Sequence, residues 1–127
     1  MPPTPVRAAD TRRTETPNAT MTTLASPTLG PTTRLSAWRV EMKRGQQGPI
    51  HAFTSEQVWT TLAGEVAIAV DGNTSVLAPG DTLVVPGRVE RQVSALADAE
   101  LLVAGYGDAQ VCLPGKDADP RTPPWIM

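Results

Sequence analysis

The sequence has few of the residues that mark several common classes of protein. Aromatic residues make up only 4% of its 127 residues, and it has one cysteine, Cys112, and one histidine, His51. A single cysteine excludes an internal disulfide bond and a zinc site built from several cysteines, and we expect Cys112 to be a small buried apolar residue. Because aromatic side chains are scarce, Val, Leu, Ile and Ala must fill the core.

Long apolar runs and an excess of one charge are also lacking. No stretch approaches the roughly 18 apolar residues of a membrane-spanning helix, and no apolar segment follows Arg7, Arg12 and Arg13, so we expect no secretory signal. The formal net charge of −2 comes from mixed signs, which favours neither nucleic acid nor an anionic membrane as a partner. We therefore predict a cytoplasmic protein that binds neither nucleic acid nor a membrane. The composition, which is rich in Ala, Thr and Pro, indicates a bacterial genome rich in GC.

Proline and glycine, in contrast, are plentiful. Thirteen prolines and ten glycines argue against long helices and favour short strands joined by tight turns. Residues 1–20 contain no Leu, Ile, Phe, Tyr or Trp, so we expect this segment to be disordered, and Met21 is an alternative start. We predict one all-β domain over residues 21–127, with its core in residues 35–113.

From residue 35 onward the apolar pattern has the period of β-strands. In Leu35–Lys43, for example, Trp38, Val40 and Met42 share one face. Asp71-Gly72 predicts a hairpin, because both central residues of a type I′ turn need a positive φ. Short strands at close spacing predict a sandwich or a barrel that encloses one small cavity. The expected strands are Leu35–Lys43, Gln57–Ala63, Glu65–Val70, Thr74–Ala78, Thr82–Pro86, Glu90–Leu96, Ala99–Tyr106 and Gln110–Leu113.

Two spaced motifs lie within this pattern. In the first, Gly45 is followed by five residues, His51-Ala52-Phe53, three residues, Gln57, six residues and Gly64. In the second, Gly80 is followed by five residues, Pro86-Gly87-Arg88, two residues, Arg91, three residues and Ala95.

These motifs resemble, without a gap, the two motifs of the cupins, a superfamily of small jelly-roll β-barrels. The resemblance extends over roughly residues 35–106 and implies a small single-domain cupin. Arg88 departs from the pattern, because the family has glycine there.

The larger departures concern metal binding. The resemblance implies that His51, Phe53, Gln57 and Arg91 occupy the positions at which cupins hold a divalent metal with two His, a Glu and a third His. Phe cannot coordinate a metal, Gln is a weak neutral ligand, and the cationic Arg repels one. We therefore predict no metal ligands and no cofactor, while an atypical divalent-metal site drawn from other residues stays an alternative.

Strand alternation predicts which side chains face the cavity. If Gln57 and Arg91 point inward as their family counterparts do, Trp59, Thr61 and Val93 also point inward, and His51 and Phe53 share a face. We assign catalysis to His51, Arg91 and Gln57. We assign substrate binding to Phe53, Trp59, Thr61 and Val93.

These side chains suit a small polar organic substrate. Arg91 can hold a carboxylate or an enolate oxygen, and His51, which ordinarily titrates near neutrality, can move a proton. The set favours a metal-independent enzyme for isomerisation, elimination or cyclisation of an unsaturated substrate. Some cupins without the full ligand set resemble isomerases or cyclases of natural-product pathways.

Other interpretations of the same residues stay open. One alternative is a non-catalytic ligand-binding or regulatory cupin, and a second is a divalent-metal dioxygenase or isomerase. Arg91 can instead form a structural ion pair with Glu41, Glu56 or Glu90. We expect Trp38 and Trp125 to pack on the barrel exterior or against a partner, and apolar outward residues such as Leu62 favour a homodimer.

Overall fold

The computed structural model of the chain describes residues 3–112 and 120–127. One helical turn, η1 (Ala8–Asp10), precedes the strands. The strands are β1 (Arg12–Glu15), β2 (Thr20–Ala25), β3 (Leu35–Met42), β4 (Ala52–Phe53), β5 (Gln57–Ala63), β6 (Val66–Val70), β7 (Asn73–Leu77), β8 (Thr82–Val85), β9 (Arg91–Ala95), β10 (Ala99–Tyr106) and β11 (Val111–Cys112).

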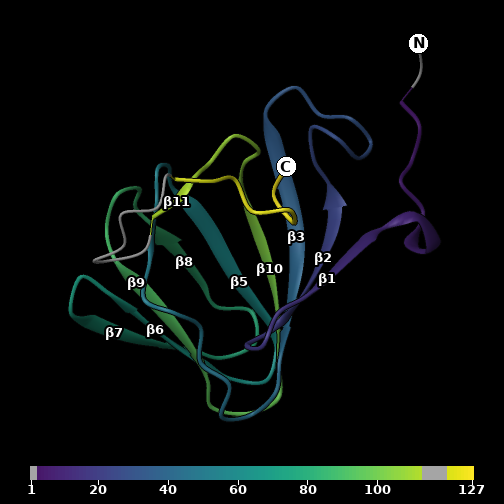
Figure 1. Ribbon diagram of the computed structural model, residues 1–127. Helices are drawn as coiled ribbons and strands as arrows, with labels where there is room; N and C mark the ends of the chain where they lie inside the picture. The colour runs from purple at the N-terminus through teal and green to yellow at the C-terminus, as the bar shows by residue number, and fades with distance from the viewer. Residues whose placement is uncertain (1–2, 113–119) are drawn as a thin grey trace.

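The strands form two facing layers of antiparallel sheet (Figure 1). The larger sheet has the order β1-β2-β3-β10-β5-β8, and the smaller one has the order β7-β6-β9. β4 pairs with β11, and an isolated bridge between His51 and Arg91 joins the β4 segment to the edge of β9. The jelly-roll β-barrel expected from the sequence is therefore confirmed.

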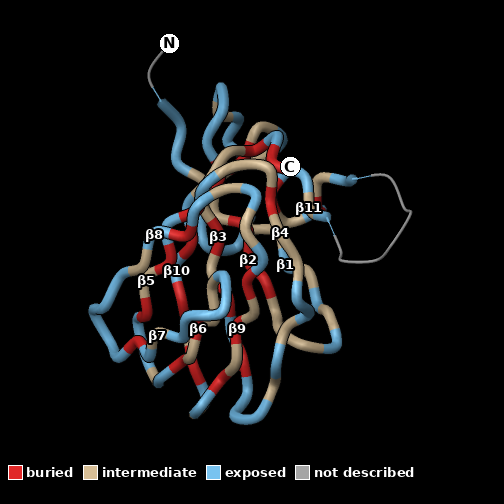
Figure 2. Tube along the Cα trace, turned by 90° about the vertical axis from the view of Figure 1, so that its left-hand side faces the viewer, coloured by how far each residue is buried: buried red, intermediate tan, exposed pale blue. Residues whose placement is uncertain are grey.

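Alternating residues of each strand fill the space between the layers. On β3, Ser36, Trp38, Val40 and Met42 are buried while their neighbours are more exposed, as the period-2 pattern predicts. Opposite them, Val66 and Ile68 of β6 are fully buried. Figure 2 shows that buried residues follow the strands and that the loops at both ends are exposed. The core is mainly aliphatic, which the scarcity of aromatic residues predicted.

Each of the eight predicted strands has a counterpart; Gln57–Ala63 has the predicted bounds, and most of the others are shifted by one or two residues. Ala99–Tyr106 has the predicted bounds, and Asp71 and Gly72 have φ values of 48° and 81°, as the predicted hairpin requires. Strands β1, β2 and β4 were not predicted from the sequence. Leu113, the last residue of one predicted strand, lies outside the described residues.

Part of the N-terminal segment, for which we expected disorder over residues 1–20, forms a strand in the structure. Arg12–Glu15 form β1, which pairs antiparallel with β2 from Arg12↔Thr23 to Glu15↔Thr20. The backbone groups of β1 that face β2 are satisfied by this pairing, which needs no apolar side chains in β1, so the composition did not indicate the strand. The larger sheet thus includes residues 12–15, while the domain boundary at residue 21 stays a prediction.

Cys112 also differs from expectation, because it is exposed rather than buried. It lies on the two-residue strand β11, whose only strand partner among the described residues is the equally short β4. So small a sheet at the edge of the barrel buries only one of its faces.

No helix in the described part of the chain is long and apolar enough to cross a membrane. The cytoplasmic location remains a prediction.

Candidate functional site

A cavity of about 280 Å³ lies inside the barrel. This volume is at the small end of the roughly 300–1,000 Å³ range of ligand pockets. Besides the residues discussed below, the lining consists of two polar residues, Thr16 and Asn18, and of Ala19, Met21, Val40, Met42, Gly48, Pro49, Val111 and Pro123.

Five of the seven predicted site residues line this cavity, namely His51, Phe53, Trp59, Arg91 and Val93. The other two, Gln57 and Thr61, point inward from β5 and are buried, but they do not line the cavity. Alternation along β5 therefore predicted the inward face correctly, but it did not show which inward side chains reach the cavity and which lie deeper in the barrel.

Arg91, the first residue of β9, is the central polar group of the site. Its side chain is only 1% exposed. Its Nε donates to the carbonyl oxygen of Val89 at 3.1 Å, one Nη to that of Pro86 at 2.7 Å, and the other Nη to Oε1 of Gln57 at 3.4 Å. All of these acceptors are neutral. A guanidinium carries five N–H groups, so one N–H on each terminal nitrogen is left for a ligand.

None of the salt bridges among the described residues includes Arg91. The structural ion pair considered for Arg91 is therefore not formed with Glu41, Glu56 or Glu90. Burial lowers the pKa of Arg91 to about 10, so the side chain stays a cation at neutral pH. An unpaired buried cation is costly, and a bound anion would offset that cost.

Gln57 orients its neighbours from behind the cavity. Its Oε1 accepts hydrogen bonds from the indole Nε1 of Trp59 at 3.1 Å and from Arg91. Its Nε2 is buried without a hydrogen-bond partner in the described part of the chain. The catalytic role that we assigned to Gln57 stays a prediction, and in the structure its amide oxygen contacts Trp59 and Arg91.

His51 lies beside Arg91, and the two residues exchange backbone hydrogen bonds of 3.1 and 2.8 Å. Burial and, secondly, the positive charge of Arg91 lower the pKa of His51 to about 4. The expectation that His51 titrates near neutrality is therefore wrong for the unliganded protein, in which the imidazole is neutral. Its Nδ1 is buried and has no partner among the described residues.

Phe53 connects the two polar side chains of the site. The imidazole of His51 contacts the Phe53 ring edge-on, with 5.0 Å between ring centroids. The guanidinium carbon of Arg91 lies 5.4 Å from the centroid of the same ring. A cation over an aromatic face is stabilised electrostatically, so Phe53 helps to hold Arg91 at the cavity wall.

The tryptophans correct a further expectation, because Trp38 and Trp125 line the cavity instead of packing on the exterior. Trp38 is only 2% exposed. Its position on the inner face of β3 follows from the same alternation that buries Val40 and Met42, so the signal was present in the sequence. For Trp125 the sequence carried no such signal, because the residue lies in an irregular segment.

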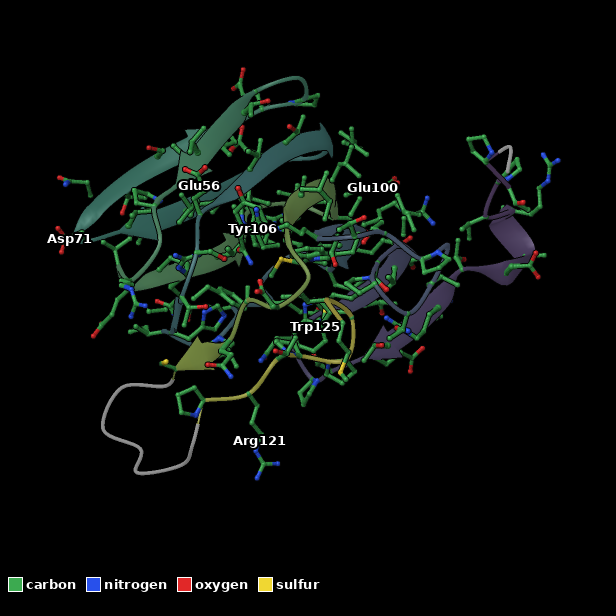
Figure 3. The ribbon with its side chains drawn as sticks, turned by 90° about the horizontal axis from the view of Figure 1, so that it is seen from above. Glu56, Asp71, Glu100, Tyr106, Arg121 and Trp125 are labelled. Carbon is green, nitrogen blue, oxygen red and sulfur yellow. The ribbon has the colours of Figure 1, made fainter. Side chains whose placement is uncertain are left out.

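Residues 122–127 bring Trp125 to the cavity and are anchored to β2 and β3. Thr23 Oγ1 donates to the carbonyl oxygen of Trp125 at 2.7 Å, and Ser36 Oγ donates to that of Ile126. The Ile126 side chain is fully buried. Seen from above, Trp125 lies near the middle of the molecule, whereas Arg121 extends from its edge (Figure 3).

The donor set at the cupin metal positions does not fit a divalent metal. It offers one imidazole, the phenyl ring of Phe53, an amide oxygen that already accepts from Trp59 and Arg91, and a guanidinium. A guanidinium at this point repels a cation. In the described residues, no group of three or more His, Cys, Asp or Glu side chains could hold one elsewhere.

The chain matches the cupin domain family over residues 38–105, more than half of its length. The protein therefore belongs to the cupin family, as the two motifs indicated.

Solved structures agree with this fold. A cupin described as RmlC-like from Shewanella frigidimarina has a TM-score of 0.68 and 24% identity over 79% of this chain and 86% of its own. KdgF from Halomonas sp. has a TM-score of 0.68 and 21% identity over 87% and 93% of the two chains.

Salicylate 1,2-dioxygenase from Pseudoaminobacter salicylatoxidans, in a structure with gentisate, has a TM-score of 0.71 and 19% identity. The match covers 83% of this chain but only 31% of the dioxygenase. At such identities the similarity concerns the fold alone. No curated protein sequence matches this chain.

Proposed function

We propose that this cupin binds a small organic anion in the barrel through Arg91 and catalyses proton transfer on it with His51, without a metal. The observation that supports this most is the buried Arg91 guanidinium, which has no acidic partner among the described residues and lines a mainly apolar cavity. A carboxylate or enolate of the substrate would be that partner.

His51 has the role of proton carrier in the proposed function. In the unliganded protein its imidazole is neutral and can accept a proton, but a base with a pKa of about 4 is weak at neutral pH. A substrate anion on Arg91 would offset the positive charge that lowers the pKa of His51. Substrate binding would therefore make His51 a stronger base.

The proposed step conserves atoms and electrons within the substrate and His51. His51 takes a proton from a carbon next to a carbonyl or carboxylate group. The electron pair of the broken C–H bond forms a C=C bond, while the π electron pair of the C=O bond moves onto the oxygen held by Arg91. Return of the proton to another carbon gives an isomer, while departure of a leaving group or attack on a second carbon gives elimination or cyclisation. Preorganised positive charge at the developing oxyanion lowers the barrier.

Hydrogen–deuterium exchange tests the step without knowledge of the natural substrate. Phenylpyruvate, a small anion with acidic C–H bonds next to a carbonyl, would be incubated with the protein in D₂O and followed by proton NMR. We expect the protein to accelerate exchange, and His51→Gln to abolish the acceleration while benzoate binding persists. Exchange at the rate of buffer alone, or full acceleration by His51→Gln, would overturn the proposed catalysis.

The alternative is a cupin that binds the same anion without converting it. The low pKa of His51 favours this alternative. Binding of the anion with no exchange would support it.

We also propose a homodimer. The outer face of the larger sheet exposes Val58, Leu62, Val84 and Leu102, and contiguous exposed apolar residues often mark an interface. Analytical ultracentrifugation should show a dimer that Val84→Lys dissociates, and a wild-type monomer at micromolar concentration would contradict this.

A further inference from the structure

We propose that the ligand of this cavity is a flat, conjugated or aromatic monoanion, and that Trp125 selects for its flatness. The inference rests on the proposed function for the location of the site, and it adds the class of the ligand. It comes from the distribution of aromatic and charged side chains.

The cavity collects nearly all the aromatic rings of a chain that has few. The sequence contains three tryptophans, one phenylalanine and one tyrosine. All of the tryptophans and the phenylalanine line this cavity. A core of this size could be filled by aliphatic residues, as the other parts of the barrel are, so this concentration points to recognition of a π system.

The rings surround the cavity from separate parts of the chain. Trp38 on β3 and Trp59 on β5 are both opposite Val103 of β10 in the sheet register, so they lie on the same inner face. Phe53 lies on β4 and Trp125 on the segment after residue 121. The hydrogen bond from Trp59 Nε1 to Gln57 satisfies the polar atom of that indole, which leaves its apolar surface for a ligand.

The charges limit the ligand to one anionic group. Among the described residues that line the cavity, Arg91 is the one charged side chain, because His51 is neutral in the unliganded protein. A second anionic group on the ligand would be buried without a partner, and so would a cationic group. The remaining lining is mainly apolar, so the rest of the ligand must be apolar or weakly polar.

Trp125 is the ring best placed to discriminate between ligands. The segment that carries it is held by hydroxyl groups of buried residues, Thr23 to Trp125 and Ser36 to Ile126. Because these bonds hold the carbonyl groups of Trp125 and of the residue after it, the indole lines the cavity from a fixed stretch of backbone. A flat ring fits against such a wall more closely than a puckered ring of the same size.

A panel of matched ligands tests the inference by isothermal titration calorimetry on the wild-type protein. The probes are benzoate, cyclohexanecarboxylate, which has the same charge but a puckered saturated ring, and benzamide, which is flat but neutral. We expect benzoate to bind about ten-fold more tightly than either of the others, since about 1.4 kcal/mol corresponds to a factor of ten. Equal affinities for benzoate and cyclohexanecarboxylate would overturn the inference.

Two variants test which residue produces the preference for a flat ligand. Trp125→Leu should remove most of the preference for benzoate over cyclohexanecarboxylate and leave the preference over benzamide. Tyr106→Leu is the matched control, because Tyr106 is the one aromatic residue outside the cavity lining, and it should leave both preferences unchanged. An unchanged preference in Trp125→Leu would contradict the role of Trp125.

The outcomes also separate this inference from the proposed function. Tight binding of benzoate without proton exchange on phenylpyruvate would overturn the catalysis and support the ligand class. Proton exchange together with equal affinity for flat and puckered anions would support the catalysis and overturn the ligand class.

Discussion

Arg88 occupies a position at which the second cupin motif has glycine, and it has the backbone conformation that glycine favours. Its φ is 64°, which crowds the Cβ atom of any L-residue. The adjacent Gly87 is needed for a different reason, because a Cβ there would lie 2.9 Å from the Cα of Ser55. The turn before β9 thus holds Arg88 in the left-handed region, and a side chain at Gly87 would clash with Ser55.

Replacing Arg88 with glycine should therefore stabilise the protein. We expect Arg88→Gly to raise the free energy of unfolding by about 0.5–1 kcal/mol, because the relief of the left-handed strain exceeds the added entropy of the unfolded chain. Urea denaturation measures this. Arg88→Ala keeps the Cβ and removes the guanidinium, so it should give no gain, and an equal gain in Arg88→Ala would contradict the explanation.

His51 should make the stability depend on pH. Its pKa is about 4 in the folded protein and 6.5 ordinarily, so between these values the unfolded chain binds more protons. The contribution of His51 to stability is complete above pH 6.5 and is lost as the pH falls toward 4, by roughly 3 kcal/mol at most. Urea denaturation across this range should show a shallower pH dependence for His51→Gln, and parallel curves would contradict the low pKa.

At the scale of single residues, the sequence predicted where the side chains lie better than their protonation states. The motif spacing placed His51, Phe53 and Arg91 at one cavity. It could not predict that His51 stays neutral, because that depends on burial and on the field of Arg91. It also could not separate Gln57 and Thr61, which lie behind the cavity, from Trp59, which lines it.

Among the elements, the turn between β5 and β6 is the most tightly constrained. Gly64 has a φ of +76°, and a Cβ there would lie 2.0 Å from the carbonyl oxygen of Asp98. The turn therefore packs directly against the backbone that connects β9 to β10. This contact fixes the ends of strands from both sheets relative to each other.

Two glycine substitutions measure how much the free energy of unfolding depends on that packing. Gly64→Ala should destabilise the protein by several kcal/mol, because it combines a positive φ with a clash against backbone atoms rather than a flexible side chain. Gly72 has a φ of +81°, but a Cβ there would have no atom of a non-adjacent residue within 4 Å, so Gly72→Ala should lose only about 1 kcal/mol. Similar losses in the two variants, measured in urea, would contradict the close approach.

The elements with a strong local signal were predictable, and the others were not. The hairpin at Asp71-Gly72 and the strand Ala99–Tyr106 follow from turn chemistry and periodicity alone. β1 is held by its pairing with β2, and β4 is only two residues long. Neither has an apolar period that a sequence could reveal.

On the scale of the whole molecule, residues 122–127 connect the end of the described chain to β2 and β3. Their carbonyl groups accept hydrogen bonds from Thr23 and Ser36, and Ile126 is completely buried. The segment thus contributes to the core of the domain and also lines the cavity through Trp125.

Truncation of the buried anchor should cost stability. Ile126→Ala should lower the free energy of unfolding by about 2–4 kcal/mol, as expected for a fully buried isoleucine. Met127 is 47% exposed, so Met127→Ala should cost less than about 1 kcal/mol. Comparable small losses for both, again in urea, would show that the segment does not contribute to the core.

The proposed function depends on a buried, positively charged Arg91 that receives an organic anion beside a neutral His51. Because His51 is the one histidine of the chain, its imidazole signals in an NMR titration need no assignment. Arg91 is the charged group that lowers its pKa, so we predict a pKa of about 4 in the free protein and a higher pKa when benzoate is saturating. An ordinary pKa near 6.5 in the free protein, or a value that saturating benzoate leaves unchanged, would contradict the proposed function.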